Sequence, residues 1–195
     1  MGVAAAALDY DAELMLRVKD GDSASFGQLL DKHRGSVVHF LYRLVGEQAV
    51  AEELAQEVFL RVYRSRGSYE PTAKFTTWLF RIATHLALNW LRDWRHERNQ
   101  ERLDDGPVDS PYRRIYDREP SIEQQLVYQV NLDQVRRAVA ALPEKQRVAV
   151  LMHKYEEMEY TQIAKVLGCS ESAVKSLLFR AYETLRARLA HVERS

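Results

Sequence analysis

One segment combines positive charge, hydroxyl groups and aromatic rings at helical spacing. Residues 75–96 contain all three tryptophans of the chain and neither glycine nor proline, so they predict an uninterrupted helix. Its polar stripe is formed by Lys74, Thr77, Arg81, His85, Arg92 and Arg95. Its apolar stripe is formed by Phe75, Leu79, Ile82 and Leu86. Such a helix can pack on a core and bind phosphates and unstacked bases with its other side, or it is a scaffold helix with a solvated basic face.

A second segment, residues 160–182, has the pattern of a helix-turn-helix. Gly168 supplies the positive φ that a tight turn between crossing helices needs, and Ser170 can cap the helix that follows. Small Ala164 allows the two helices to approach closely. The exposed side of the second helix is expected to carry Glu171, Ser172, Lys175, Ser176, Phe179 and Arg180. The pattern favours DNA binding, although unrelated helical hairpins also produce it.

A third segment is acidic. The helix expected over roughly residues 48–66 buries an apolar stripe and places Glu52, Glu53, Gln56 and Glu57 on a neighbouring face. A face of this kind is either simply solvated or a docking surface for a basic partner.

The sequence lacks the groupings of residues that usually perform catalysis or bind metals. We find no P-loop, nucleophile elbow, carboxylate pair or Cys/His cluster, and the six histidines lack a paired-ligand spacing. We therefore expect neither an enzyme nor a metal or other cofactor. Cys169 is the only cysteine, which excludes an internal disulfide framework, and it reads as a small packing residue in the turn.

These segments sit in a chain whose composition favours an all-α protein. Its 195 residues include five prolines and eight glycines, with long helical periodicities between them. Asp9 and Asp22 are expected to cap two helices that end near Gly21 and Gly46, and Gly35 is a possible interruption of the second helix. No signal peptide or membrane span is recognisable, so a cytoplasmic protein is expected.

Charge and proline content indicate two domains. Acidic side chains outnumber basic ones in residues 1–60, and the balance reverses in residues 61–102, so a net charge of zero does not exclude nucleic acid. Residues 103–121 hold three prolines and few apolar side chains, as expected of a flexible linker. The predicted organisation is a frayed N-terminus (1–8), a helical domain (9–102), the linker (103–121) and a second helical domain (122–191). The second domain should begin with a helix over residues 121–141, which Leu142-Pro143 ends. A second helix should start at Pro143 or Glu144 and continue to about Tyr155.

Four motifs in this order resemble the extracytoplasmic-function (group IV) sigma factors of bacterial RNA polymerase. They are Ala51-Glu-Glu-Leu-Ala-Gln-Glu-Val-Phe-Leu-Arg-Val62, Phe75-Thr-Thr-Trp-Leu-Phe-Arg-Ile-Ala83, Leu142-Pro-Glu-Lys-Gln-Arg147, and Tyr160-Thr-Gln-Ile-Ala164 with Val174-Lys-Ser-Leu-Leu-Phe-Arg-Ala181. The resemblance covers nearly the whole chain. It implies two helical domains, region 2 and region 4, and no catalytic activity.

The resemblance also implies a role for each motif. The acidic helix would dock on the clamp helices of the largest polymerase subunit through Glu53, Gln56 and Glu57. The helix from Phe75 and the loop before it would open the minus-ten promoter element, where a displaced base is held against protein. The residues expected there are Lys74, Thr76, Thr77, Trp78, Arg81, His85 and Arg92. Trp78 is alternatively a core residue, because Leu79 and Ile82 beside it are expected to be buried.

The C-terminal helix-turn-helix would read the minus-thirty-five element in the major groove. The contacts expected there come from Thr161, Ser172, Lys175, Ser176, Phe179 and Arg180. The implied partners are core RNA polymerase, promoter DNA and an anti-sigma factor, with no cofactor. His85 and Leu177 stand where the family often has Asn and Arg, which leaves the preferred bases open.

Three other functions compete with this interpretation. A stand-alone helix-turn-helix repressor or activator explains residues 160–180 but not an acidic helix beside an aromatic and basic one. A nucleic-acid enzyme predicts an acidic metal cluster, which the sequence lacks. A purely structural helical bundle predicts no loss of transcription when Lys175 and Arg180 are replaced by alanine.

Overall fold

The computed structural model describes residues 9–101 and 132–190, without the side chains of residues 98–101, and all regular structure in these ranges is helical. The elements are α1 (Tyr10–Lys19), α2 (Ser23–Val45), α3 (Gln48–Arg64), the 3-10 helix η1 (Arg66–Ser68), α4 (Phe75–Glu101), α6 (Glu144–Tyr155), α7 (Tyr160–Leu167) and α8 (Glu171–Leu189). Residues 132–140 are also helical. The expected all-α class is confirmed. The predicted linker and the frayed N-terminus lie outside the described residues.

Local capping accounts for several helix ends that the sequence predicts. The Asp9 side chain accepts a hydrogen bond from the Ala12 amide, and Asp22 accepts from the Ala24 and Ser25 amides. Gly46 ends α2 in the left-handed conformation with φ 83°, where a residue with a Cβ would be strained. Gly35 does not interrupt α2, because a single exposed glycine within 23 helical residues is tolerated.

Two helices end differently from the prediction. The third helix, expected to about Arg66, stops at Arg64 and continues as the 3-10 turn η1. The helix expected over residues 75–96 continues to Glu101. Both differences lie at helix ends, where the sequence signal is weakest.

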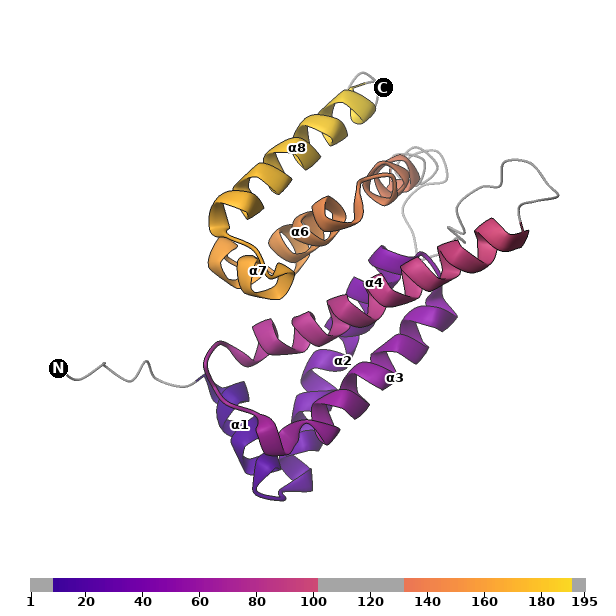
Figure 1. The fold of residues 1–195 in the computed structure, drawn as a ribbon. Helices are drawn as coiled ribbons and strands as arrows, with labels where there is room; N and C mark the ends of the chain where they lie inside the picture. Colours follow the sequence, from indigo (N-terminus) through magenta and orange to yellow (C-terminus); the bar gives the residue numbers. More distant parts are fainter. Residues whose placement is uncertain (1–8, 102–131, 191–195) are drawn as a thin grey trace, which may run out of the picture.

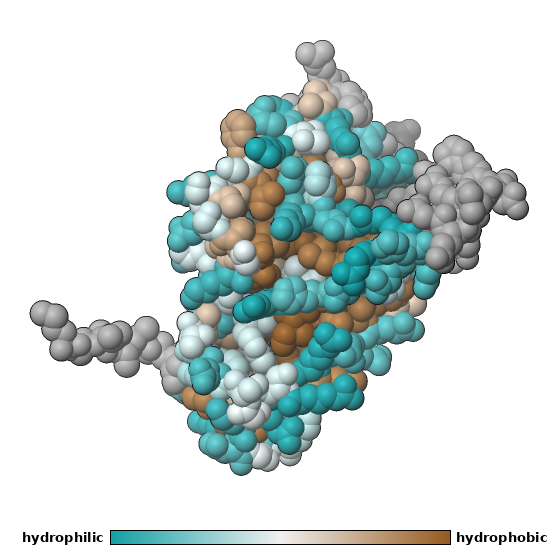
Figure 2. Space-filling view, in the orientation of Figure 1, coloured by the Kyte–Doolittle hydropathy of each residue, from teal (hydrophilic) through white to brown (hydrophobic). Residues whose placement is uncertain are grey.

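Helices α1 to α4 pack together, and α6 to α8 form a smaller group that lies beside α4 (Figure 1). Buried side chains of both groups belong to one hydrophobic cluster. Within α1 to α4, Phe40 and Phe80 meet edge to face, with ring centroids 5.1 Å apart. Figure 2 shows hydrophobic side chains on both sides of α4 and hydrophilic ones along its outer edge. No helix in the described ranges has the length and apolar character that crossing a membrane requires.

Candidate nucleic-acid interface

The start of α4 is tied to the N-terminal helices. The Phe75 amide donates to Asp9 Oδ2 at 3.3 Å, so the carboxylate that caps α1 also accepts from the first turn of α4. The Phe75 ring is fully buried, 5.5 Å from the His33 ring. His33 Nε2 lies 2.9 Å from Asp11 Oδ2, and burial lowers the pKa of His33 despite this carboxylate. These contacts hold the loop that carries Lys74 in one place.

Trp78 lies at the edge of the core. Its ring centroid is 4.9 Å from that of Tyr69 and 6.0 Å from that of Phe75, and the side chain remains partly exposed. Burial raises the pKa of the Tyr69 hydroxyl to about 12, so this ring stays neutral. Trp78 is therefore a packing residue whose ring stays partly exposed.

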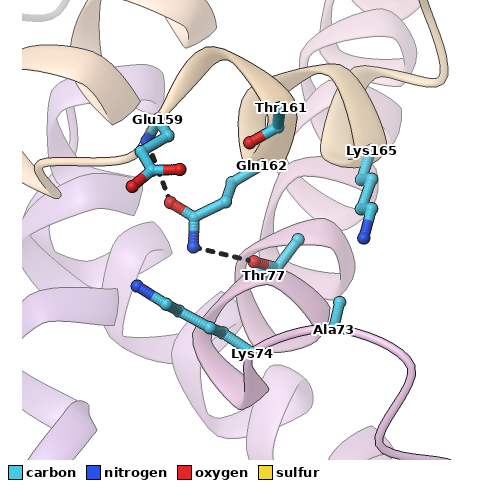
Figure 3. Close-up of a pocket in the computed structure, with 7 residues that line it drawn as sticks. All are labelled: Ala73, Lys74, Thr77, Glu159, Thr161, Gln162 and Lys165. Carbon is cyan, nitrogen blue, oxygen red and sulfur yellow. Dashed lines mark hydrogen bonds between the residues drawn. The ribbon is translucent and has the colours of Figure 1, made fainter. Parts of the chain in front are cut away.

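The polar stripe predicts that Thr77 is exposed, but the structure buries it. Its side chain is 3% exposed, because α7 packs over this part of α4. Gln162 Nε2 donates to Thr77 Oγ1 at 3.4 Å, and Gln162 Oε1 accepts from the Glu159 amide at 2.9 Å (Figure 3). One amide side chain thus caps α7 and contacts α4.

A small cavity separates α7 from the start of α4. Its volume is about 140 Å³, and it is lined by Ala73, Lys74, Thr77, Glu159, Thr161, Gln162 and Lys165 (Figure 3). Three of these residues, Lys74, Thr77 and Thr161, are candidate DNA contacts. The structure therefore brings candidate contacts of the two modules together at one place.

The remaining candidates on α4 are accessible. Arg81, His85 and Arg92 are exposed, and Thr76 is half-buried. The Arg92 guanidinium lies 3.3 Å from Asp93, in an ion pair that is open to solvent on both sides. Farther along the helix, the partly exposed rings of Trp90 and Trp94 stack with centroids 6.1 Å apart.

The second helix of the helix-turn-helix has the predicted geometry. Gly168 takes φ 63°, and Ser170 Oγ accepts from the Ala173 amide at 3.2 Å. Val174 and Leu178 are buried, as expected. The α8 face, which we define as Ser172, Lys175, Ser176, Phe179 and Arg180, is exposed throughout. Phe179 is 68% exposed, the largest exposed fraction among the exposed large hydrophobic side chains in the described part of the chain.

The α3 face, which we define as Glu53, Gln56 and Glu57, also lies on the surface. Glu53 and Gln56 are exposed, whereas Glu57 is half-buried and pairs with Arg61 at 2.8 Å. Leu60, one turn along the helix, is 48% exposed. The surface is thus acidic with one apolar side chain and one internal ion pair.

Sequence reasoning missed the contacts that join the two halves. They are made by Arg43, Arg95, Glu144, Arg147, Tyr155 and Gln162. Their partners lie far away in sequence, so no local pattern marks them. The described residues contain no group of three His, Cys, Asp or Glu side chains placed to hold a metal ion.

Comparison with known protein families gives two matches. Residues 29–97 match Sigma-70 region 2, and residues 132–185 match Sigma-70, region 4. The RNA polymerase sigma-H factor of Pseudomonas aeruginosa is 30% identical over 91% of this chain and 92% of its own length. The RNA polymerase sigma factor CarQ of Myxococcus xanthus is 35% identical over 92% of this chain and 97% of its own length.

Two solved structures share the fold. CnrH, in complex with the cytosolic domain of CnrY, superposes with a TM-score of 0.69 at 21% identity, covering 94% of this chain and 99% of CnrH. The sigma factor RpoE of Bartonella quintana, in complex with the anti-sigma factor NepR, gives 0.66 at 22% identity, covering 85% of this chain and 96% of RpoE.

Proposed function

Because the chain belongs to the extracytoplasmic-function group of the sigma-70 family of RNA polymerase sigma factors, we propose that it directs core RNA polymerase to promoters through the three surfaces described above. The α3 face binds the clamp helices of the largest subunit. The start of α4, with Lys74, Thr76, Thr77 and Trp78, holds the opened minus-ten element. Arg81, His85 and Arg92 hold the backbone along the same helix.

The α8 face reads the minus-thirty-five element, and its exposure is the observation that carries the proposal. A capped helix that follows a glycine turn presents two cations, two hydroxyls and an aromatic ring in one row. Cations bind guanine edges or phosphates, and an aromatic ring suits a thymine methyl group. To Thr161, at the start of α7, we assign a contact with the DNA backbone.

The chain binds polymerase and promoter DNA and catalyses no reaction itself, since the polymerase makes the RNA. It needs no cofactor of its own, and it works in the cytoplasm, where the polymerase is. CnrH is in complex with the cytosolic domain of CnrY, and RpoE is in complex with the anti-sigma factor NepR. We include an anti-sigma factor among the partners on this basis, together with core polymerase and promoter DNA.

The test is transcription in vitro with core polymerase on a promoter library. The wild-type chain should select a promoter set with two conserved elements. Lys175→Ala and Arg180→Ala should each reduce initiation about 10- to 100-fold, because a lost base contact costs about 1–3 kcal/mol. Arg188→Ala is the matched control, since Arg188 is an exposed cation of α8 about two turns beyond Arg180.

Three outcomes would contradict the proposal or part of it. A wild-type chain that never associates with core polymerase would exclude a sigma factor, and tight sequence-specific binding to duplex DNA without polymerase would favour a stand-alone regulator. Full initiation by the Lys175→Ala and Arg180→Ala variants would remove the assigned role of the α8 face.

A further inference from the structure

The loop between η1 and α4, residues 69–74, is held at both ends by α1 (Figure 1). At one end, Lys19 Nζ donates to the carbonyl oxygen of Tyr69 at 3.0 Å. At the other end, the amide of Phe75, the first residue of α4, donates to Asp9 Oδ2 at 3.3 Å. Asp9 is the N-cap of α1 and Lys19 is its last residue. One helix therefore spans the loop and binds the backbone on both sides of it.

Helix α1 is itself fixed on α2 by a buried charge. Asp11 is 7% exposed, accepts from Lys32 Nζ at 2.7 Å and lies 2.9 Å from His33 Nε2. A carboxylate so deeply buried would be costly without these partners, so the two pairs fix the position of α1 on α2. Apolar side chains of α1 add to this, and Met15 is fully buried. The loop is thus attached to a rigid support.

The loop between its two ends lies largely in solvent. Glu70, Pro71, Thr72 and Lys74 are exposed, and Ala73 is half-buried. A hydrogen bond from the Thr72 amide to the Glu70 carbonyl oxygen, at 2.8 Å, closes a tight turn inside the loop and does not attach it to the core. The position of such a segment depends on how its ends are held.

The two ends of the loop also place candidate contacts with the minus-ten strand. Lys74 directly precedes Phe75, and the Trp78 ring lies 4.9 Å from the ring of Tyr69 and 6.0 Å from that of Phe75. A shift at either end would therefore move Lys74 or change the packing under Trp78. An opened strand that binds an already ordered loop avoids the free-energy cost of ordering it.

We propose that Asp9 and Lys19 are positioning residues for promoter opening: they hold both ends of the loop 69–74 and thereby place Lys74 and Trp78 for the opened minus-ten strand. Neither positioning side chain needs to touch DNA. The inference rests on the proposed function, because the loop has this task only if the chain opens promoters. It gives α1 a part in opening that the residue types of this helix do not indicate.

The charge of Asp9 separates this role from a simple electrostatic effect. Removing a carboxylate beside a DNA surface should strengthen DNA binding, because phosphates are repelled less. A positioning role predicts the opposite, namely that Asp9→Asn weakens promoter opening. Asn keeps one side-chain oxygen for the Ala12 amide and turns an NH2 group toward the Phe75 amide, so α1 stays capped while the end of the loop is released.

The experiment compares initiation on two templates, using the full chain with core polymerase. One is a duplex promoter selected from the library, and the other is the same promoter with the template strand mismatched across the minus-ten element, so that this element is already open. Premelting removes the cost of strand separation, so weaker capture of the opened strand limits initiation on the duplex only. A chain that is merely less stable loses the same fraction of activity on both templates.

Asp9→Asn and Lys19→Met should each reduce initiation about fivefold to tenfold on the duplex and less than about twofold on the premelted template. Lys19→Arg keeps a donor for the Tyr69 carbonyl group and should behave as the wild type. Asp22→Asn is the matched control for Asp9, because the side-chain hydrogen bonds of this N-cap stay within α2. Arg17→Gln is the control for Lys19, because it removes another exposed cation of α1. Both controls should initiate as the wild type does.

Several results would overturn the positioning role and leave the proposed function intact. These are equal losses on both templates, no loss on either, stronger initiation by Asp9→Asn on the duplex, or losses of the same size in the two controls. A wild-type chain that is inactive with polymerase on both templates would instead overturn the proposed function.

Discussion

The starts of α4 and α8 are both candidate DNA surfaces, yet the free chain presents them differently. At the start of α4, Thr77 is 3% exposed beneath Gln162, whereas Phe179 on α8 is 68% exposed. Both helices are amphipathic and carry cations. The difference comes from packing on neighbouring helices and not from the composition of either segment. A polar stripe thus predicts what a face can bind, but not whether it is accessible.

The largest difference in the free energy of unfolding is expected between alanine substitutions of two phenylalanines, one on α4 and one on α8. Phe75→Ala should lower the free energy of unfolding by about 3–5 kcal/mol, because the fully buried ring leaves a cavity at the start of α4. Phe179→Ala should change it by less than about 0.5 kcal/mol, because the ring is mostly in water already. Urea denaturation measures both. A large loss of stability in Phe179→Ala would show that the α8 face is not free.

A smaller effect is expected from Glu156, which follows α6. Burial raises its pKa to about 7 from an ordinary value of 4.5, against the attraction of Arg43 on α2. The folded state therefore favours the protonated carboxyl, and its stability falls as pH rises from about 4.5 through 7. The effect is on the order of 1–2 kcal/mol after allowance for solvent screening. Glu156→Gln should remove this slope in unfolding experiments at a series of pH values.

Two controls make the pH prediction specific. Arg43→Gln should raise the pKa of Glu156 further in an NMR titration, because it removes a charge supplied by the other domain. His33, in the N-terminal domain, has a pKa lowered by burial, so its contribution is complete above 6.5 and is lost as pH falls. His33→Gln should therefore flatten the acid side of the profile and leave the Glu156 slope unchanged. A profile that Glu156→Gln does not alter would refute the assignment.

A smaller difference in stability is expected between substitutions of two N-cap residues, Asp9 of α1 and Ser170 of α8. Asp9 accepts from Ala12 in α1 and from Phe75 in α4, whereas Ser170 accepts from Ala173 alone. Asp9→Ala should cost about 1–2 kcal/mol and Ser170→Ala about 1 kcal/mol, because each removes a cap. Thermal unfolding measures the costs, and amide exchange at Phe75 should accelerate in Asp9→Ala only. Unchanged exchange at Phe75 would show that Asp9 does not hold α4.

The smallest effect is expected from Arg95→Ala. Arg95 and Glu144 are 53% and 32% exposed, so their ion pair should contribute at most about 1 kcal/mol to the free energy of unfolding. A loss of several kcal/mol in thermal unfolding would show that this contact contributes more than a partly exposed ion pair should.

Much of the local structure could be predicted, because its causes lie within a few residues. Asp9, Asp22 and Ser170 cap the helices for which they were identified, and Gly46 and Gly168 take the left-handed conformation. The buried positions of α8 follow from a helical repeat. The family was also accessible from four motifs in a fixed order. The assigned DNA and polymerase contacts stay predictions.

The sequence by itself determined the helices, their caps, the helix-turn-helix and the two-module sigma-factor plan, because propensity, capping and apolar periodicity act between near neighbours. Only the tertiary structure decided that Thr77 is covered, since its partner Gln162 is 85 residues away. The contact of Arg147 with Leu44, across 103 residues, has the same origin. A contact between residues so far apart in sequence depends on how two surfaces pack against each other. The local sequence of either segment does not determine that packing.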